Sequence, residues 1–322
     1  MQYSLNRGIC MEKQDKWTNL MYYVVFGLSH LLSLLPFCIL YFLSDGLYLL
    51  MYYCIKYRRD VVRDNLLKSF PEKSLDELIR IEKKFYHFFC DYFVETLKLT
   101  SISKKEMRKR MVFRGVEQVE QAVHEEGHNF IFLYLGHYCN WEWIASLPYT
   151  ISPSIHCAQI YHPLYNKAVD RFFLKLRNQF GGECIPMKNT LRRVIELKRE
   201  KRPTMIGFIS DQLPKWNSMH FFVPFLHRET AVFTGAEQIG RQVKAVYFFA
   251  DIIRPRRGYY ECTFRRMEIP EVNRTEYDMT AMFMEQLEQM IRKAPQYWLW
   301  THKRWKRTKE EWLRRQQDST IK

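Results

Sequence analysis

Apolar and polar positions divide this chain into an uncharged N-terminal segment and a longer part in which short apolar runs alternate with amphipathic stretches. None of the 28 residues from position 17 to position 44 is Asp, Glu, Lys or Arg, and Asp45 alone interrupts the run before Lys56. A bilayer is crossed by ~20 apolar residues. Because Pro36 lies inside the run, the pattern predicts either one kinked span or two short helices that enter one leaflet. We therefore predict a membrane anchor at residues 17–55, with a buried core helix as the alternative.

A strongly amphipathic helix is predicted after Pro71, because Ser74 and Glu77 have the spacing of a capping box. Aromatic residues recur on one face of this helix at helical spacing, among them Phe85 and Phe89. Such a face either packs on the core or lies against a membrane, and core packing is the expected outcome.

From Gly115 onward, candidate strands alternate with candidate helices, which predicts an α/β fold with a mixed, mostly parallel sheet flanked by helices. Functional residues of such sheets lie at the carboxyl ends of the strands. The pattern predicts strands at residues 129–135, 155–161, 204–209 and 221–225, an antiparallel pair at 246–253 and 259–267, and helices at 115–126, 165–180, 190–200, 234–243 and 276–293.

The best candidate for chemistry follows the first of these strands, where His137 and Glu142 stand in a turn after Gly136. The two side chains can meet if a helix starts near Asn140, a good N-cap residue, with Glu142 in its first turn. An imidazole held by a carboxylate is a general base for a hydroxyl. The alternative is a capping or core histidine beside a glutamate that complements a helix N-terminus.

The charge of the chain indicates what kind of partner it binds. The net charge of +15, from 50 Lys and Arg against 35 Asp and Glu, indicates an anionic partner: nucleic acid, an anionic membrane surface, or an acidic substrate or carrier. Ten Lys and Arg against three Asp and Glu lie in residues 292–322, interleaved with aromatic residues. Next to an anchor, such a segment is expected to bind anionic lipid headgroups, with single-stranded nucleic acid as the alternative.

Eight cysteines without a C-x-x-C pair indicate reduced thiols, neither a disulfide framework nor a zinc site.

The residues around His137 resemble a known signature. Gly136-His137, Asn140-Trp141-Glu142, and several later blocks are similar to the lipid A secondary acyltransferases (the lauroyl and myristoyl transferase group) within the H-x4-D/E glycerolipid acyltransferase superfamily. The later blocks are Tyr161-His162-Pro163, Leu176-Arg177-Asn178, Ser210-Asp211-Gln212, Phe222-Val223-Pro224-Phe225, Thr234-Gly235, and the segment from Pro295 to Lys306. Two positions depart from the family: His162 stands where Arg or Lys is common, and Cys139 where Gly is frequent.

The resemblance implies transfer of a fatty acyl group from acyl carrier protein to a hydroxyl of a lipid A precursor, without a cofactor or a covalent enzyme intermediate. His137 would then be the base and Glu142 the residue that orients it. The bases nearest the strand ends are candidates for binding phosphate or an oxyanion, with Arg177 the best of them. The candidate substrate-binding residues are Arg177, Asp211, Arg171, Lys188, Arg192 and Asn140, with Lys215 a further base nearby.

The predicted organisation is a flexible N-terminus at residues 1–16, the anchor at 17–55, one acyltransferase domain at 56–307 and a basic C-terminal tail at 308–322. Lys56, Arg58 and Arg59 follow the anchor and favour a catalytic domain on the cytoplasmic side of the inner membrane. Anionic membrane lipids are thus expected partners and nucleic acid is not. A lysophospholipid or other glycolipid acyltransferase is the alternative enzyme, and a membrane-tethered nucleic-acid-binding protein the alternative outside enzymes.

Overall fold

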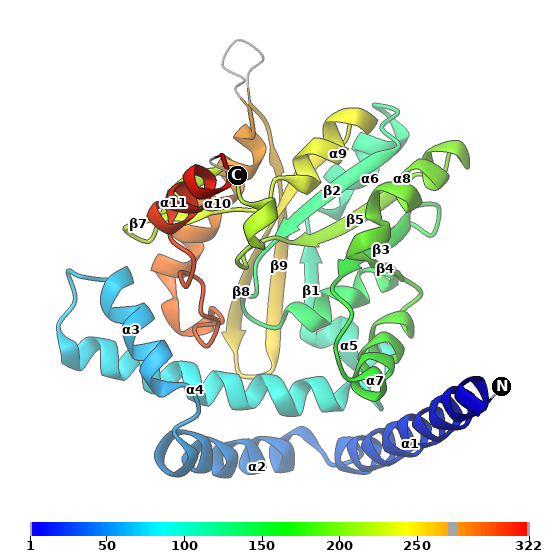
Figure 1. Cartoon of the computed structure of the whole chain (residues 1–322), viewed down its shortest axis with the longest axis vertical. Helices are drawn as coiled ribbons and strands as arrows, with labels where there is room; N and C mark the ends of the chain where they lie inside the picture. The colour runs from blue at the N-terminus through cyan, green and yellow to red at the C-terminus, as the bar shows by residue number, and fades with distance from the viewer. Residues whose placement is uncertain (1, 270–275, 321–322) are drawn as a thin grey trace.

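The computed structural model describes residues 2–269 and 276–320, and the side chains of residues 17–269 and 276–318. Its N-terminal part is helical, and α1, α2 and α4 run along one side of the molecule, below the sheet in Figure 1. Ser74 forms the predicted capping box at the start of α4. The bounds of this part are α1 (Gln2–Ser33), α2 (Phe37–Leu49), the π-helical segment η1 (Leu50–Ile55), α3 (Arg59–Ser69), α4 (Leu75–Lys98) and α5 (Lys104–Arg110).

A seven-stranded sheet with the order β1-β9-β8-β2-β5-β3-β4 forms the centre of the molecule. Every pair in it is parallel except β8 with β9, so the predicted mixed, mostly parallel sheet and its antiparallel pair are confirmed. The strands are β1 (Met111–Arg114), β2 (Phe130–Leu135), β3 (His156–Tyr161), β4 (Glu183–Pro186), β5 (Thr204–Ile209), β8 (Val246–Arg256) and β9 (Tyr259–Met267), with a separate antiparallel pair β6 (Phe222–Phe225) and β7 (Arg228–Ala231).

Helices flank the sheet as the alternating pattern predicts (Figure 1). The pattern did not reveal β1 and β4, which are four residues each and lie at the two edges of the sheet. A strand this short offers too few alternations for a period to stand out. The remaining helices are α6 (Val116–His124), the 3-10 helix η2 (Trp141–Tyr149), α7 (Lys167–Asn178), η3 (Met187–Asn189), α8 (Thr190–Arg199), η4 (Trp216–Ser218), α9 (Gly235–Val243), α10 (Asp278–Lys293), η6 (Pro295–Tyr297) and α11 (Lys309–Thr320).

Strand β2 lies near the middle of the sheet, and all six of its residues are buried. It pairs with β8 on one side and β5 on the other, so no residue of it reaches an edge. A parallel strand buried on both faces has a continuous apolar sequence, which is what Phe-Ile-Phe-Leu-Tyr-Leu is. The residues that follow β2 therefore emerge from the most rigid part of the fold.

The aromatic residues of the C-terminal segment belong to the core. Trp298 is 2% exposed and Trp300 is fully buried, and Arg304 between them and the tail is 1% exposed. The expectation that these rings would bind lipid headgroups or stack on nucleic acid is therefore wrong for Trp298 and Trp300, since both uses require exposed rings. Helix α11 lies far from α1 and α2, on the opposite side of the molecule (Figure 1).

Candidate active site

The strand order places His137 opposite Asp211. In the register of β2 and β5, Leu135 pairs with Ile209, so His137 and Asp211 each stand two residues beyond a paired position. The imidazole Nδ1 of His137 lies 2.6 Å from Oδ1 of Asp211, and the backbone N–H of His137 donates to Oδ2 at 2.9 Å. Two contacts to one carboxylate fix both the position and the ring orientation of His137.

The turn that carries His137 is held by the C-terminal segment. Tyr138 forms a β-bridge with Trp298, and the backbone N–H of Cys139 donates to the carbonyl of Tyr297 at 2.9 Å. Leu299 returns its N–H to the carbonyl of His137 at 3.1 Å. The C-terminal segment therefore stabilises the turn after β2 through its backbone.

Two positions in this turn have special backbone requirements. A Cβ at Gly136 would lie 2.7 Å from Cδ1 of Leu287, so that side chain would have to move, and 3.4 Å from Oδ2 of Asp211, an ordinary contact distance. Cys139 has a φ of 51°, in the left-handed region that glycine adopts without strain. This conformation explains why glycine is suited to position 139, and a non-glycine residue there costs about 1 kcal/mol.

Asp211 is an ionised, fully engaged carboxylate. Its side chain is 2% exposed, and the indole N–H of Trp298 donates to Oδ2 at 2.8 Å. Burial alone would raise the pKa of Asp211, but the charge and hydrogen bonds of His137, together with the Trp298 indole, lower it to about 2. An ionised carboxylate can only accept hydrogen bonds, so Nδ1 of His137 carries the proton and donates to Asp211, which leaves the lone pair on Nε2. That nitrogen lies 3.3 Å from the amide nitrogen of Gln212.

His302 supports the same turn from behind. Its Nε2 accepts the backbone N–H of Leu213 at 3.3 Å, directly after Asp211 and Gln212. Burial lowers the pKa of His302 to about 4, so its ring is neutral at pH 7 and can accept this bond. His302 therefore has a structural role beside the site, one that requires the uncharged form.

Glu142 contacts a different partner from the one expected. The sequence pattern predicted that Glu142 would hold His137, but the carboxylate on the imidazole belongs to Asp211. Glu142 accepts two hydrogen bonds from Arg177, at 2.8 Å from Nε and 2.6 Å from Nη2, and the hydroxyl of Tyr92 lies 3.5 Å away. The reason is local: Glu142 starts η2, which packs against α7, so its side chain points to the helix that carries Arg177.

The Glu142–Arg177 pair is buried, with side chains 3% and 20% exposed. Burial alone would lower the pKa of the guanidinium, but the Glu142 carboxylate raises it above its ordinary value. Arg177 therefore keeps its charge, and the bidentate geometry of its two hydrogen bonds to Glu142 links α7 to η2.

The other predicted site residues lie in several places. Asn140 is the N-cap of η2 as expected, since its side chain accepts from the N–H of Trp143, and its amide donates to Glu95 at 2.7 Å. Arg171 faces α1, where it donates to Asn19 at 2.9 Å. Arg192 pairs with Glu196 on the exposed side of α8, and Lys188 and Lys215 are exposed. Only Asp211 among these contacts His137.

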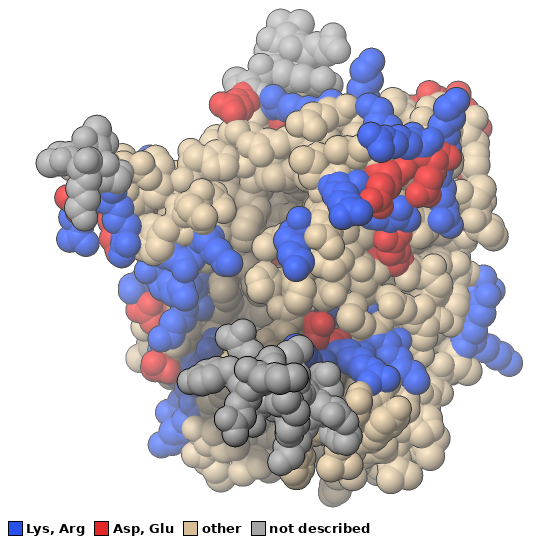
Figure 2. All heavy atoms as spheres, turned by 45° about the vertical axis from the view of Figure 1, so that its right-hand side comes forward, with Lys and Arg blue, Asp and Glu red and all other residues tan. Residues whose placement is uncertain are grey.

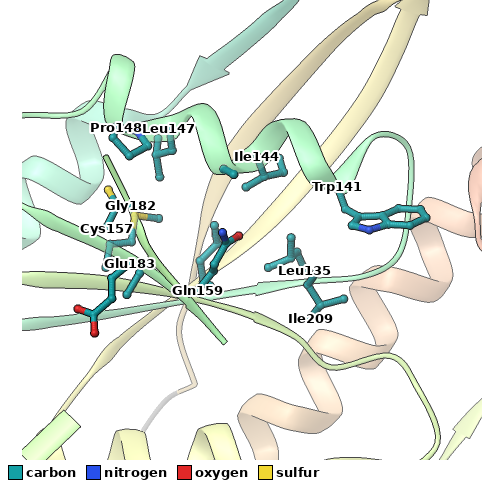
Figure 3. A pocket seen from close by; sticks show the side chains of 15 residues that line it. Leu135, Trp141, Ile144, Leu147, Pro148, Cys157, Gln159, Gly182, Glu183 and Ile209 are labelled. Atoms are coloured by element: carbon teal, nitrogen blue, oxygen red, sulfur yellow. The ribbon is translucent and has the colours of Figure 1, made fainter. Parts of the chain in front are cut away.

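A narrow apolar pocket begins beside His137. Trp141, whose ring centroid is 5.2 Å from that of His137, lines one end of it together with Leu135 and Ile209. Figure 3 shows Trp141, Ile144 and Leu147 of η2 facing Leu135, Gln159 and Ile209 of the strands, with Glu183 at the far end. The pocket is also lined by Leu133, Ala145, Pro148, Cys157, Ala158, Gly182, Met205 and Gly207. The lining is apolar, as in sites that contact hydrocarbon, and the cavity of about 50 Å³ is smaller than an acyl chain.

One cluster has the residue types of a metal site. Side-chain atoms of Asp45, His87 and Asp91 lie within 4.8 Å of one another. Arg257 already donates to both carboxylates, at 2.5 Å to Asp45 and 2.6 Å to Asp91. A guanidinium thus supplies the positive charge that a metal ion would bring, so this cluster is an ion-pair network.

Basic side chains on the face shown in Figure 2 form several separate groups. Asp and Glu lie among them, most densely in the group at the upper right of that view. The excess of positive charge is therefore not gathered into one continuous patch on this face.

Two comparisons with known proteins identify the family of this chain. Residues 11–307 match the model of the bacterial lipid A biosynthesis acyltransferase family. A lipid A biosynthesis acyltransferase of Haemophilus influenzae is 25% identical over 274 residues, which cover 84% of this chain and 82% of that protein. The chain therefore belongs to the bacterial lipid A biosynthesis acyltransferases, and it is an acyltransferase.

Proposed function

We propose that this protein transfers a fatty acyl group from acyl carrier protein to a hydroxyl of a lipid A precursor, with His137 as general base. The observation that carries the proposal is the His137 imidazole, held on the Asp211 carboxylate at the open end of an apolar pocket. Membership of the family supports the lipid A precursor as acceptor. The reaction takes place at the cytoplasmic face of the inner membrane.

The proposed step uses the free nitrogen of His137. Nε2 takes the proton of the acceptor hydroxyl, and the resulting oxygen attacks the thioester carbonyl carbon of the donor. Collapse of the tetrahedral intermediate breaks the C–S bond, and the imidazolium returns its proton to the departing thiolate. Asp211 stabilises the imidazolium and keeps the proton of the resting ring on Nδ1. The product is an ester, a free thiol and an unchanged histidine, so no covalent enzyme intermediate is required.

The pocket beside Trp141 holds the acyl chain of the donor in this proposal. With the thioester at His137, the chain enters between η2 and strands β2, β5 and β3 in the direction of Glu183, and the cavity of about 50 Å³ widens to admit it. Glu142 and Arg177 act at a distance from the reacting atoms: their pair fixes η2, the helix that forms one wall of the pocket. They are positioning residues. Substrate binding by Arg171, Lys188 and Arg192 stays a prediction.

Contacts with the N-terminal helices support a lipid acceptor. The ring of Phe37, at the start of α2, packs edge-on against Trp143 of η2 with centroids 6.4 Å apart. Phe26 of α1 packs against Phe172 of α7, also at 6.4 Å. The two helices that carry the Glu142–Arg177 pair, η2 and α7, therefore both touch the apolar N-terminal segment.

The test is acyl transfer by the purified full chain from acyl carrier protein thioesters to a lipid A precursor. We expect His137→Ala to lower kcat by about 10²–10⁴-fold, the usual contribution of a general base. His162→Ala is the matched control, because His162 is exposed and its ring contacts only the neighbouring carbonyl of Pro163 among the contacts described. Retention of more than a third of the activity in His137→Ala would falsify the mechanism.

The same assay separates the alternatives for donor and acceptor. Replacing acyl carrier protein by coenzyme A, or the lipid A precursor by a lysophospholipid, should lower kcat/KM. Equal rates with a lysophospholipid would favour the alternative enzyme. Mass spectrometry of lipid A from cells that lack the protein gives an independent answer, because an unchanged number of acyl chains would point to another acceptor.

A further inference from the structure

Helix α2 turns several polar side chains, with the buried Leu40 among them, towards the protein and large apolar side chains outward. On α2, Tyr41, Ser44 and Asp45 face the protein, whereas Ile39, Phe42 and Leu43 face outward and are 43%, 74% and 43% exposed. A helix on the surface of a water-soluble protein has the opposite arrangement, with its apolar stripe toward the core. The outward face of α2 therefore suits hydrocarbon and not water.

The inward polar stripe is fixed to the catalytic domain by named contacts. Ser44 donates to Asp91 of α4 at 2.8 Å, and Tyr41 donates to Glu95 at 3.0 Å. Asp45 binds Arg257, in the connection between β8 and β9, at 2.5 Å and lies 2.9 Å from Nε2 of His87. Further along, Tyr52 of η1 donates to Glu82 at 3.0 Å.

The break between α1 and α2 is also held by the domain. Lys98, at the end of α4, donates to the carbonyls of Ser33 and Leu35 at 2.5 and 2.9 Å. The hydroxyl of Ser101 donates to the same carbonyl of Ser33 at 2.8 Å. These bonds satisfy backbone groups that a helix break would otherwise leave open, which lipid cannot do.

Helix α1 continues the outward apolar surface. Its inward side lies on α7, where Arg171 stacks over the ring of Tyr22 with 4.1 Å to the centroid. Leu28 and Leu31 on the outward side are 60% and 65% exposed, and Trp17 is 71% exposed. In Figure 1, α1 and α2 lie end to end along one side of the molecule. We call the exposed apolar side chains of these two helices, taken together, the apolar strip.

A spanning orientation conflicts with these contacts. Crossing the bilayer with the helix from Phe37 to Ile55 would carry Asp45 into the hydrocarbon core. Asp45 would have to leave Arg257 and His87, or else bring the charged groups of α4 with it, and either choice costs several kcal/mol. If the same helix lies in the plane of the membrane, it keeps the contacts of Tyr41, Ser44 and Asp45 with the protein. Only its apolar face then enters the hydrocarbon.

We propose that α1, α2 and η1 are an in-plane anchor that enters only the leaflet next to the catalytic domain, and that the chain does not cross the bilayer. The occupant of the apolar strip is the hydrocarbon of that leaflet. Exposed Tyr53 and Tyr57 at the end of η1, followed by Lys56 and Arg58, lie where interfacial rings and anionic headgroups meet. This proposal does not depend on the acyl-transfer chemistry.

The test measures depth in the membrane at separate points of the strip. A fluorescent nitrobenzoxadiazole group is attached to a cysteine introduced as Leu28→Cys, Phe42→Cys or Tyr53→Cys in the full chain. The exposed Cys38 and Cys54, the half-buried Cys184, and Cys10 are first replaced by Ser, and the remaining cysteines are buried. Phosphatidylethanolamine and phosphatidylglycerol vesicles with doxyl quenchers at two chain positions then report the depth of each label. Leu313→Cys on α11, 47% exposed and far from the strip, is the matched control.

We expect the three labels to lie at the same shallow depth, about 5–10 Å below the headgroups, and the label at position 313 to remain unquenched. A helix perpendicular to the membrane would separate positions 42 and 53 by about 16 Å, from a rise of 1.5 Å per residue. A graded depth of that size would overturn the proposal. So would an absence of quenching at all three positions. Neither result involves activity, so either can be told apart from a failure of the proposed reaction.

Discussion

Two buried carboxylates flank the apolar pocket, and their partners give them different uses. Glu142 is 3% exposed and Asp211 is 2% exposed, and each accepts two hydrogen bonds from one neighbouring residue. The partner of Glu142 is Arg177, which keeps its charge under all physiological conditions. The partner of Asp211 is His137, the side chain type that gains and loses a proton near pH 7.

The two pairs therefore have different roles, one in supporting the structure and the other in proton transfer. An Arg–Glu pair has one charge state, so it serves to hold two helices at a fixed distance. A His–Asp pair has two, and the carboxylate stabilises the second one when the imidazole accepts a proton. His137, the predicted base, is thus in contact with a carboxylate that can support it. Glu142, predicted to orient His137, is instead in contact with Arg177, which does not change charge.

Asp211→Asn is the substitution with the largest expected effect on activity. We expect kcat to fall by about 10³–10⁴-fold, because an amide cannot hold Nδ1–H in place or stabilise the imidazolium. KM should change by less than about threefold, since the acyl pocket is untouched. The measurement is steady-state acyl transfer.

A second readout separates this role from a merely structural one. The ¹⁵N chemical shifts of the His137 ring should show one tautomer in the native protein and a mixture in Asp211→Asn. An unchanged tautomer with unchanged kcat would show that Asp211 does not position the base.

Glu142→Gln should mainly lower the stability of the folded protein. Removing one partner of a buried ion pair leaves the other charge unpaired, which costs about 3 kcal/mol of the free energy of unfolding. Urea unfolding in detergent measures this loss. Replacing Arg177 by Met in the same chain should restore part of the stability, because no unpaired charge then remains.

The matched control is Glu126→Gln, since Glu126 forms the same bidentate contact with Arg266 at the surface, at 2.7 and 2.8 Å. Its unfolding midpoint should not change measurably. If Glu142→Gln instead kept its stability and lost as much activity as Asp211→Asn, Glu142 would belong to the chemistry, and the contrast between the two carboxylates would fail.

The smallest effect concerns His302, which supports the Asp211 side of the site. In the folded protein burial lowers the pKa of His302 to about 4, whereas an unfolded histidine titrates near 6.5. The unfolded chain therefore binds a proton over this interval that the folded chain does not, so stability is lost as the pH falls from 6.5 to 4.

We expect the native protein to lose about 2 kcal/mol of its free energy of unfolding through His302 between pH 7 and pH 4.5, after allowance for partial exposure. His302→Gln should remove this contribution. The difference between the two proteins, measured by urea unfolding at both pH values, isolates it from the other titrating groups. An equal pH dependence in both would show that His302 is not held neutral.

Local sequence patterns predicted much of the fold. Alternating apolar runs located β2 and β5 to within one residue, and the capping box located the start of α4. These features depend on residues close together in the chain, so the sequence contains all the information required. The turn after β2 was likewise predicted from Gly136 and Asn140, because N-capping is a local interaction.

The partner of His137 could be decided only by the tertiary structure. Glu142 is five residues away in sequence and Asp211 is 74, yet Asp211 makes the contact because β2 and β5 are neighbours in register. Strand order in a sheet depends on how all the crossovers pack together, which no local period encodes. The orientation of the anchor has the same cause: the sequence showed an uncharged run, and the positions of Asp91 and Arg257 decided which side of it faces the protein.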